Sequence, residues 1–361
     1  MNFPYFNTKE LSDGRTYNLT DPAERLQYFH AKLGSKIDEV KEYLEHNSFV
    51  GYMLAKKIAG KGTYAGMFTE IVGQERFAHI SAGDVVRDAH VLLDSPEEAM
   101  ERERKELLSY IDKHYRGYIS AEEAIKALLN RSNDRVSVPS ELMLTLLKRE
   151  IDRVGKKALF VDGMPRSLDQ ISYSLYFRDL INYRNDPDFF IFIDVAEEII
   201  DMRIRGRVVC PVCKTSKNML TNPGKFVRHD TETGEYYLVC DNAVCPGYEK
   251  ARYYSKEGDV AGKDTIAERL KSDGELMEMS MGLQGMPKVL IRSSYPVDEA
   301  SEYIEDYEIQ PVFKYKGTGD NIEVMTEPWI FKDDEGVDSY SIYAATYVVS
   351  MFSQIHKILV G

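Results

Sequence analysis

The sequence predicts an α/β protein: a parallel sheet of about five strands flanked by helices, with a P-loop at the end of the first strand. Five short runs are mainly apolar, which is typical of strands buried on both faces, and helical patterns separate them as in βαβ units. The turn Gly60-Lys61-Gly62-Thr63 follows the first run and opens a helix. The expected strands cover residues 49–54, 77–80, 158–162, 189–195 and 288–292.

Helical patterns fill the chain before, between and after these strands. Asp21 and Pro22 predict the N-cap and first residue of an amphipathic helix, because apolar residues then recur every three or four positions as far as Leu44. Residues 88–138 predict two or three charged helices between the second and third strands. Residues 339–359 predict a C-terminal helix whose apolar face packs on the core.

Composition limits the class of partner and the compartment. The chain has 361 residues, of which 43% are hydrophobic and 29% charged, so a large core and an enzyme-like globular protein are expected. A net charge of −13 disfavours a groove for nucleic acid. The chain starts without a signal-like segment, and no apolar stretch reaches the roughly 18 to 20 residues of a membrane span. We therefore expect a cytoplasmic protein, acting as a monomer.

The first candidate site is the turn after the first strand. A P-loop has the pattern G-x-x-x-x-G-K-[ST], and here Ala55 stands at the first glycine. The expected helix over residues 64–71 would point backbone N–H groups at phosphate oxygens, Lys61 would reach the β and γ phosphates, and the Thr63 hydroxyl would ligate Mg²⁺. The alternative is an exposed lysine-rich turn without a ligand.

Two other strand ends carry groups of the same kind. The third strand ends in Asp162, at the sheet edge where a carboxylate can hold Mg²⁺ beside the P-loop. Gly163 and Pro165 then predict a tight turn that aims Arg166 across the same crevice. The second strand is followed by a small-residue turn and by Arg87, one helical turn further on. Together these residues suit the binding of two phosphate groups.

All four cysteines lie close together in the sequence, which favours a structural zinc. Cys210 and Cys213 are separated by two residues, and Cys240 and Cys245 by four. Four thiolates in two pairs can bind a tetrahedral Zn²⁺. Two alternatives remain: four thiols without a metal, or a site in which His229 replaces one cysteine.

Over residues 49–270 the chain resembles the adenylate kinases and, more broadly, the nucleoside monophosphate kinases. The P-loop turn, "ISAGDVVR", "DGMPRSLDQ", "RIRGR", the cysteine segment and "AERL" follow one another in the order of that family. The resemblance implies a P-loop sheet with an inserted helical segment for the acceptor and a zinc-bound lid. It also implies ATP and AMP as ligands, with Mg²⁺ and a structural Zn²⁺ as cofactors.

The resemblance assigns roles to individual residues. Arg87 and Arg166 would grip the acceptor monophosphate, and Gln170 would read its adenine. Arg203 would lie against the ATP base and Arg207 on the phosphates. Catalytic roles are implied for Lys61, Arg87, Asp162, Arg166, Arg207 and Arg269, ATP contacts for Ala59, Gly60, Lys61, Gly62, Thr63, Tyr64, Arg203 and Arg207, and acceptor contacts for Ala82, Arg87, Val138, Gly163, Arg166 and Gln170.

Four positions depart from the family pattern. Ala55 and Ile58 replace two P-loop glycines, which would reshape the loop around the β-phosphate. Ala82 stands where adenylate kinases commonly have a threonine near the acceptor base, which weakens the preference for AMP. The second lid arginine of the family has no direct counterpart, so either Arg252 or Lys256 serves in its place or no residue does.

We expect an N-terminal helical extension over residues 1–48 and a kinase core over residues 49–361, with insertions at 84–138 for the monophosphate and at 208–258 for the lid. The predicted activity is transfer of the ATP γ-phosphoryl group to AMP. One alternative is the same fold acting on GMP, CMP, UMP or dTMP, and another is a catalytically silent protein that binds a nucleotide or RNA. Basic and aromatic residues near the cysteines allow the RNA alternative: Lys225, Phe226, Arg228, Tyr236, Tyr237, Arg252 and Tyr253.

Overall fold

The computed structural model describes residues 3–130, 138–164, 187–255, 259–319 and 321–361. Its centre is a five-stranded parallel sheet in the order β10-β4-β1-β3-β2, which confirms the predicted fold class. Each strand lies within one residue of its predicted bounds. The strands are β1 (Val50–Ala55), β2 (Phe77–Ser81), β3 (Ala158–Asp162), β4 (Asp188–Asp194) and β10 (Lys288–Arg292).

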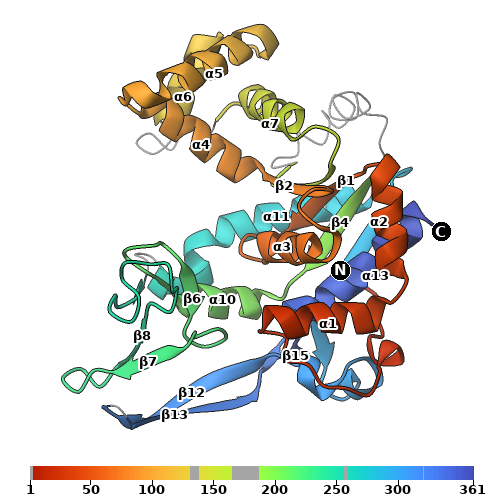
Figure 1. Ribbon diagram of the computed structural model, residues 1–361, viewed down its shortest axis with the longest axis vertical. Coiled ribbons are helices and arrows are strands. Elements are labelled where there is room, and N and C mark those ends of the chain that lie inside the picture. Colours follow the sequence, from red (N-terminus) through yellow and green to blue (C-terminus); the bar gives the residue numbers. More distant parts are fainter. Residues whose placement is uncertain (1–2, 131–137, 165–186, 256–258, 320) are drawn as a thin grey trace.

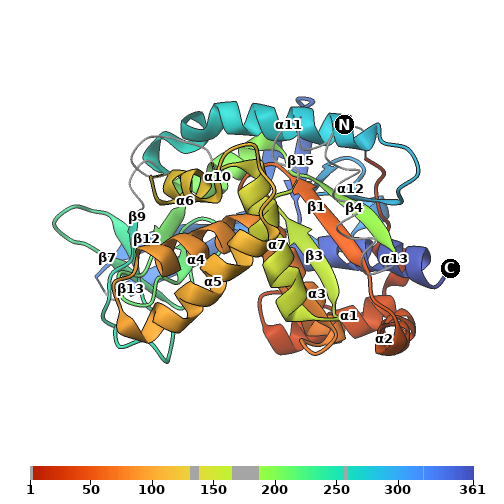
Figure 2. The ribbon, with the colours of Figure 1, turned by 90° about the horizontal axis from the view of Figure 1, so that it is seen from above.

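Helices cover both faces of this sheet (Figures 1 and 2), so the strands are apolar on both sides. One face packs against α1 (Pro22–Leu33), α2 (Lys36–His46), α3 (Lys61–Val72) and α13 (Ala344–Leu359). The other face packs against α7 (Ser140–Val154) and α11 (Ala267–Met281), and α4 (Ala82–Asp94), α5 (Glu101–His114) and α6 (Ala121–Asn130) extend that layer. Buried phenylalanines fill the first layer: the ring centroid of Phe160 lies 4.7 Å from that of Phe77 and 4.9 Å from that of Phe68.

Two predicted helices differ in the structure. The pattern over residues 21–44 predicts one helix, whereas the chain forms α1 and α2, because Gly34 takes a left-handed φ of 54° at the C-terminus of α1. The predicted N-cap is present, since the Asp21 carboxylate accepts hydrogen bonds from two backbone N–H groups of the first turn. The C-terminal helix begins at Ala344, later than predicted, because Asp338–Ser341 pairs as strand β15 instead.

A small subdomain follows α10 (Glu197–Arg205) and contains all four cysteines; we call residues 207–255 the cysteine subdomain. Its five short strands form two small sheets, which lie away from the central sheet (Figure 1). They are β5 (Arg207–Val209), β6 (Ser216–Asn218), β7 (Phe226–His229), β8 (Tyr236–Val239) and β9 (Tyr254–Ser255). The segment η3 (Asp259–Ile266) leads back to the core.

A long hairpin from the C-terminal part of the chain runs along the cysteine subdomain (Figure 1). Its strands are β12 (Pro311–Thr318) and β13 (Asn321–Pro328). Phe313 donates its N–H to the carbonyl of Leu220 at 2.8 Å, and the Tyr236 hydroxyl donates to the carbonyl of Gly317 at 2.8 Å. The rings of Tyr236 and Tyr315 are 5.4 Å apart. The hairpin therefore touches the outer edge of the subdomain at several points.

At its base the hairpin continues into a small three-stranded sheet next to the core. This sheet contains β11 (Ser294–Pro296), β14 (Ile330–Lys332) and β15. The remaining short helices are η1 (Lys9–Leu11), η2 (Glu98–Met100), α12 (Ala300–Tyr303) and η4 (Asp306–Glu308). Among the helices in the described ranges, none is long and apolar enough to cross a membrane.

A buried ion pair joins the N-terminal helices to this C-terminal region. Lys32 Nζ lies 3.5 Å from Glu308 Oε1, and both side chains are at most 1% exposed. Glu308 also accepts hydrogen bonds from the hydroxyls of Tyr28 at 2.5 Å and Thr8 at 2.7 Å. Burial, together with the neighbouring Glu308, raises the pKa of Tyr28 well above its usual value, so this phenol stays a neutral donor. A buried charge with this many partners holds the two ends of the chain together.

Candidate active site

The candidate site lies where three neighbouring strands end at the same edge of the sheet. Asp162 is the last residue of β3, and it pairs in register with Met53 of β1 and Ser81 of β2. The segment between β1 and α3 starts at this edge, so the side chain of Lys61 at the start of α3 can reach Asp162. Parallel α/β sheets bind ligands at the carboxyl ends of their strands.

Lys61 and Asp162 face each other in this crevice. Lys61 Nζ lies 3.4 Å from Asp162 Oδ1 and 3.3 Å from the carbonyl oxygen of Ala55. The two side chains are 15% and 16% exposed, so both are partly desolvated but still reached by solvent. His79 Nε2 lies 4.0 Å from Asp162 Oδ2, and burial lowers the pKa of this imidazole despite the nearby carboxylate. The crevice thus presents one ammonium group and one carboxylate to a ligand.

The P-loop (residues 55–63) has an unusual backbone. Ile58, which replaces a glycine of the family pattern, has a φ of +66°, and Gly60 has a φ of +101°. A β-branched residue at positive φ is rare and costs about 1–3 kcal/mol, so the surroundings must hold it there. At Gly60 a Cβ atom would lie 3.0 Å from the Tyr64 hydroxyl, so both conformation and space require glycine. Residue 58 therefore keeps the positive φ that favours glycine, although isoleucine stands there.

Side chains from outside hold the carbonyls of this loop. Arg203 of α10 donates to the carbonyl of Ala59 at 2.7 Å and to that of Ile58 at 3.3 Å. The Tyr64 hydroxyl donates to the same Ala59 carbonyl at 2.7 Å. Burial raises the pKa of Tyr64, which keeps it a neutral donor. The structure thus directs the guanidinium of Arg203 to the loop, and contact between Arg203 and a nucleotide base stays a prediction.

Three more contacts fix the first part of the loop. The N–H of Lys57 donates to Asp273 Oδ2 at 2.9 Å, and Asp273 Oδ1 lies 2.8 Å from Nε of Arg269. Lys56 Nζ is 3.1 Å from carboxylate oxygens of both Glu197 and Asp334. Burial acts to lower the pKa of Lys56, but the two carboxylates outweigh it and the pKa is raised. Every residue from Lys56 to Ala59 is therefore tied to another part of the chain.

The remaining predicted ATP and catalytic residues lie in the first turn of α3, on α11 and at the root of the cysteine subdomain. Arg207, at the start of the cysteine subdomain, forms two hydrogen bonds of 2.8 Å with the carboxylate of Asp259. Arg269 is 42% exposed on α11, on the Asp273 side of the loop. Gly62 and Thr63 are exposed in the first turn of α3. The structure thus brings Lys61 and Asp162 together and connects Arg269 to the loop through Asp273, whereas Arg207 is engaged at the root of the subdomain.

Of the candidates for the second lid arginine, only Arg252 is described. Its guanidinium pairs with Asp230 at 3.0 Å and lies 4.1 Å from the ring centroid of Tyr237, both within the cysteine subdomain. Lys256 lies outside the described residues. A role of Arg252 at the phosphates stays a prediction.

The predicted acceptor residues lie on α4 and at neighbouring strand ends. Arg87 is 61% exposed and pairs with Asp84 one turn earlier at 2.7 Å. Ala82 is fully buried at the start of α4, Val138 is half-buried, and Gly163 has a φ of +81° after β3. Arg166 and Gln170 lie outside the described residues, so the structure does not place them.

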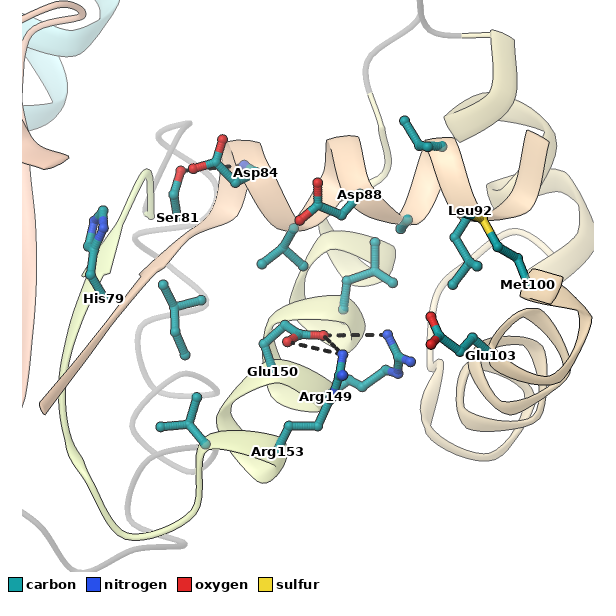
Figure 3. Close-up of a pocket in the computed structure, with 16 residues that line it drawn as sticks. His79, Ser81, Asp84, Asp88, Leu92, Met100, Glu103, Arg149, Glu150 and Arg153 are labelled. Atoms are coloured by element: carbon teal, nitrogen blue, oxygen red, sulfur yellow. Dashed lines mark hydrogen bonds and ion pairs between the residues drawn. The ribbon is translucent and has the colours of Figure 1, made fainter. Parts of the chain in front are cut away.

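A cavity of about 480 Å³ lies next to this segment, between α4, α7 and the start of α5. Figure 3 shows Asp84 and Asp88 of α4 along one wall, and Glu150 of α7, paired with Arg149 and Arg153, along another. None of the described acceptor residues predicted from the sequence lines it. Asp84, the partner of Arg87, and Val91, one turn after Arg87, do line it, so the cavity borders the α4 face that carries Arg87.

The cysteines converge in the cysteine subdomain as predicted. The four Sγ atoms of Cys210, Cys213, Cys240 and Cys245 all lie within 4.8 Å of one another, and those of Cys213 and Cys240 are 3.8 Å apart. In a Zn²⁺ tetrahedron with four sulfur ligands, neighbouring sulfurs are about 3.8 Å apart. His229 is not part of this cluster; its ring packs against Tyr236 instead.

The thiol chemistry of the cluster also suits a cation. Hydrogen bonding with Thr215 lowers the pKa of Cys213 to about 6, whereas burial raises the pKa of Cys240 to about 12. Without a cation, four thiolates this close would repel one another; a divalent ion removes this repulsion. The four cysteines therefore fit a structural zinc.

Comparison with known proteins connects this geometry to a family. No protein-family model matches the chain. The adenylate kinase of Thermotoga petrophila is 29% identical over 236 residues, which cover 60% of this chain and 93% of that protein. The adenylate kinase of Staphylococcus epidermidis is 32% identical over 214 residues, which cover 59% of this chain and 75% of that protein. The chain belongs to the adenylate kinase family. A shorter match, 34% over 88 residues, is to the adenylate kinase of Mycoplasma mycoides.

For this adenylate kinase family member, sequence reasoning missed the carboxylates that hold the P-loop. Asp273 follows Arg269 by four residues on a predicted helix, so an i,i+4 ion pair was a detectable signal. Its hydrogen bond to Lys57 spans 216 residues and left no trace in the sequence. The contact of Asp334 with Lys56, over 278 residues, was equally invisible.

Proposed function

We propose that the chain is a nucleoside monophosphate kinase that transfers the γ-phosphoryl group of MgATP reversibly to AMP and yields two ADP. The observation that carries the proposal is the pair of Lys61 and Asp162 at the carboxyl edge of the sheet, beside a loop that opens α3. This arrangement offers an ammonium group, a helix N-terminus and a carboxylate to a polyphosphate. Membership of the adenylate kinase family supports the same reaction class.

Positioning and charge compensation account for the chemistry. The acceptor phosphate supplies its own nucleophilic oxygen, so no protein base has to activate it. Lys61 would exchange its contact with Asp162 for the β and γ phosphates, while Arg87 and Arg166 would hold the acceptor phosphate in line. Thr63 and Asp162 would hold Mg²⁺, which neutralises charge on the phosphate oxygens when bound.

We propose three roles for segments of the chain. Residues 84–138 form the acceptor segment, residues 208–258 form the lid, and the cysteine cluster holds a structural zinc inside that lid. The small apolar cluster around the cysteines supports the last role, since a subdomain of this size gains most of its stability from a metal. Closure of the lid would bring Arg207 to the phosphates and exclude water from the transfer.

The acceptor base is tested directly by product formation. Purified protein with MgATP is offered AMP, GMP, CMP, UMP and dTMP separately, and nucleoside diphosphates are separated by chromatography. We expect two ADP per AMP consumed and little product with the other acceptors. Product with a different base would move the assignment to that acceptor. A protein that binds MgATP but makes no product with any acceptor would contradict the proposal.

A further inference from the structure

We propose that Asp273 of α11 is a positioning residue: its carboxylate fixes the P-loop backbone at Lys57 and the guanidinium of Arg269 together. Asp273 would thus set both the affinity of the loop for ATP and the direction of an arginine of the site. This inference rests on the proposed function and names a determinant of the nucleotide site.

The geometry assigns a separate oxygen to each contact. Oδ2 of Asp273 accepts the Lys57 N–H at 2.9 Å, and Oδ1 lies 2.8 Å from Nε of Arg269. The side chain of Asp273 is 7% exposed, so water competes little for either oxygen. Hydrogen bonds to an ionised carboxylate are about twice as strong as neutral ones. Both contacts can therefore exist at the same time, and both are made by the same carboxylate on α11.

The altered loop explains why such a contact is needed. Ile58 follows Lys57 directly and is held at a φ of +66°, which a β-branched residue leaves unless its neighbours are fixed. Arg203 holds the carbonyl of Ile58 on the C-terminal side, and Asp273 holds the N–H of Lys57 on the N-terminal side. Hydrogen bonds therefore fix the backbone on both sides of Ile58. A glycine at position 58 would adopt the same conformation without this support.

The same arrangement occurs a second time in the chain. Asp201 pairs with Arg205 four residues later at 2.6 Å, and its other oxygen accepts the N–H of Lys263 at 2.7 Å. Here too a helical carboxylate fastens a distant backbone segment, η3, to its own helix. Asp201 therefore provides a matched control: the same chemistry acting on a segment other than the P-loop.

The experiment compares Asp273→Ala, Asp273→Asn and Asp201→Ala with the unaltered protein. Hydrogen exchange of a peptide containing Lys57 reports the loop, titration calorimetry reports the Kd for MgATP, and steady-state kinetics separate the KM for ATP from the KM for the acceptor. For Asp273→Ala we expect at least tenfold faster exchange at Lys57, a Kd for MgATP raised about tenfold and an acceptor KM within twofold of normal. Asp201→Ala should accelerate exchange at Lys263 and leave that at Lys57 unchanged.

Asp273→Asn separates the two functions of the carboxylate. Its amide oxygen can still accept the Lys57 N–H, but it carries no charge for Arg269. We expect a near-normal Kd for MgATP together with a kcat lowered about tenfold. If Asp273→Ala does not fold, this variant decides: an unchanged kcat would overturn the proposal, because Arg269 would then keep its direction without the charge of Asp273.

The outcomes separate this proposal from the proposed function. If the unaltered protein transfers phosphoryl groups but Asp273→Ala has a normal Kd for MgATP and normal exchange at Lys57, the positioning role is wrong and the function stands. A lowered melting temperature without a change in Kd or exchange would likewise contradict the positioning role, because Asp273 would then contribute to stability alone. If MgATP binds with the expected dependence on Asp273 but no acceptor is phosphorylated, the proposed function fails and the positioning role stands.

Discussion

The P-loop and the cysteine subdomain are held in place in opposite ways. From Lys56 to Ala59 the loop has no core of its own and is tied residue by residue to α3, α10, α11 and the turn after β14. The cysteine subdomain has its own small apolar cluster around four sulfur atoms. Its described hydrogen bonds to the rest of the chain lie at its root and at its outer edge on the hairpin. At the root Arg207 bonds to Asp259, and Asn218 and Met219 bond to carbonyls at the end of α10.

This difference matches the different tasks that we propose for the two regions. A loop that cradles phosphates must keep one shape, and many short polar contacts to fixed elements achieve this. A lid must move as a unit, which requires internal stability and few connections to the core. Substitutions in the P-loop should therefore change catalysis and loop conformation, whereas substitutions in the cysteine subdomain should change its metal content and local stability.

The largest effect is expected from Lys61→Ala. Removing the ammonium group beside Asp162 should lower kcat by about 10³-fold without unfolding the protein, because the charge acts on the phosphoryl group in the transition state. Steady-state kinetics and circular dichroism check this. Lys57→Ala is the matched control, since that exposed neighbour contributes its backbone to the described contacts and should keep near-normal activity. Equal loss in both variants, or no loss in Lys61→Ala, would contradict the assignment.

Cys240→Ser tests whether a bound zinc stabilises the cysteine subdomain. Losing one of four ligands should release about one zinc per chain and lower kcat about tenfold or more, while the central sheet stays folded. Elemental analysis measures the zinc content, steady-state kinetics measure kcat, and thermal unfolding checks that the central sheet stays folded. His229→Gln is the control, because His229 lies outside the sulfur cluster and its replacement should leave the metal content unchanged. A metal-free, equally stable unaltered protein would count against the zinc site.

Tyr315→Ala tests the connection between the hairpin and the cysteine subdomain. The substitution removes the ring that lies 5.4 Å from Tyr236 and the hydroxyl that donates to the carbonyl of Met219. We expect hydrogen exchange in β7 and β8 to accelerate about threefold to tenfold, with a twofold change in kcat at most. Tyr118→Ala, at a residue 93% exposed, should change neither. Unaltered protection in β7 and β8 would show that the hairpin does not restrain the subdomain.

The smallest effect concerns the strain at Ile58. At its φ of +66°, Ile58→Gly should be more stable than Ile58→Ala by about 1 kcal/mol, because alanine keeps the Cβ penalty that glycine lacks. Chemical denaturation measures the difference. At Lys105, which is exposed in α5, the order should reverse: Lys105→Gly should be less stable than Lys105→Ala by about 1 kcal/mol. The same order at both positions would mean that Ile58 carries no conformational strain.

The sheet and the cysteine cluster could be predicted because their signals are local. Short, mainly apolar runs marked all five strands, and Cys210 and Cys245 belong to a segment that contains every cysteine. The support of the P-loop could not be predicted, because Asp334 and Asp273 reach it only through the folded chain. The break between α1 and α2 was missed because the apolar period continues across Gly34.

Roles of single residues were the hardest to predict. Arg203 is placed on the loop by two carbonyl contacts, and nothing in its spacing indicated them. Arg166 and Gln170 lie outside the described residues, and their assignments rest on the resemblance. Motif order thus identifies a family, whereas the partner of each side chain depends on tertiary packing.

The buried pair of Lys32 and Glu308 has a consequence for synthesis of the chain on the ribosome. Tyr28 and its acceptor Glu308 are 280 residues apart in the chain. At a translation rate of roughly 5 to 20 residues per second, Glu308 is therefore added about 15 to 55 seconds after Tyr28. During that time Lys32 lacks its carboxylate, and the apolar faces of α1 and α2 lack α13. Residues that are synthesised late, Glu308 and α13, therefore complete the burial of helices that are synthesised early.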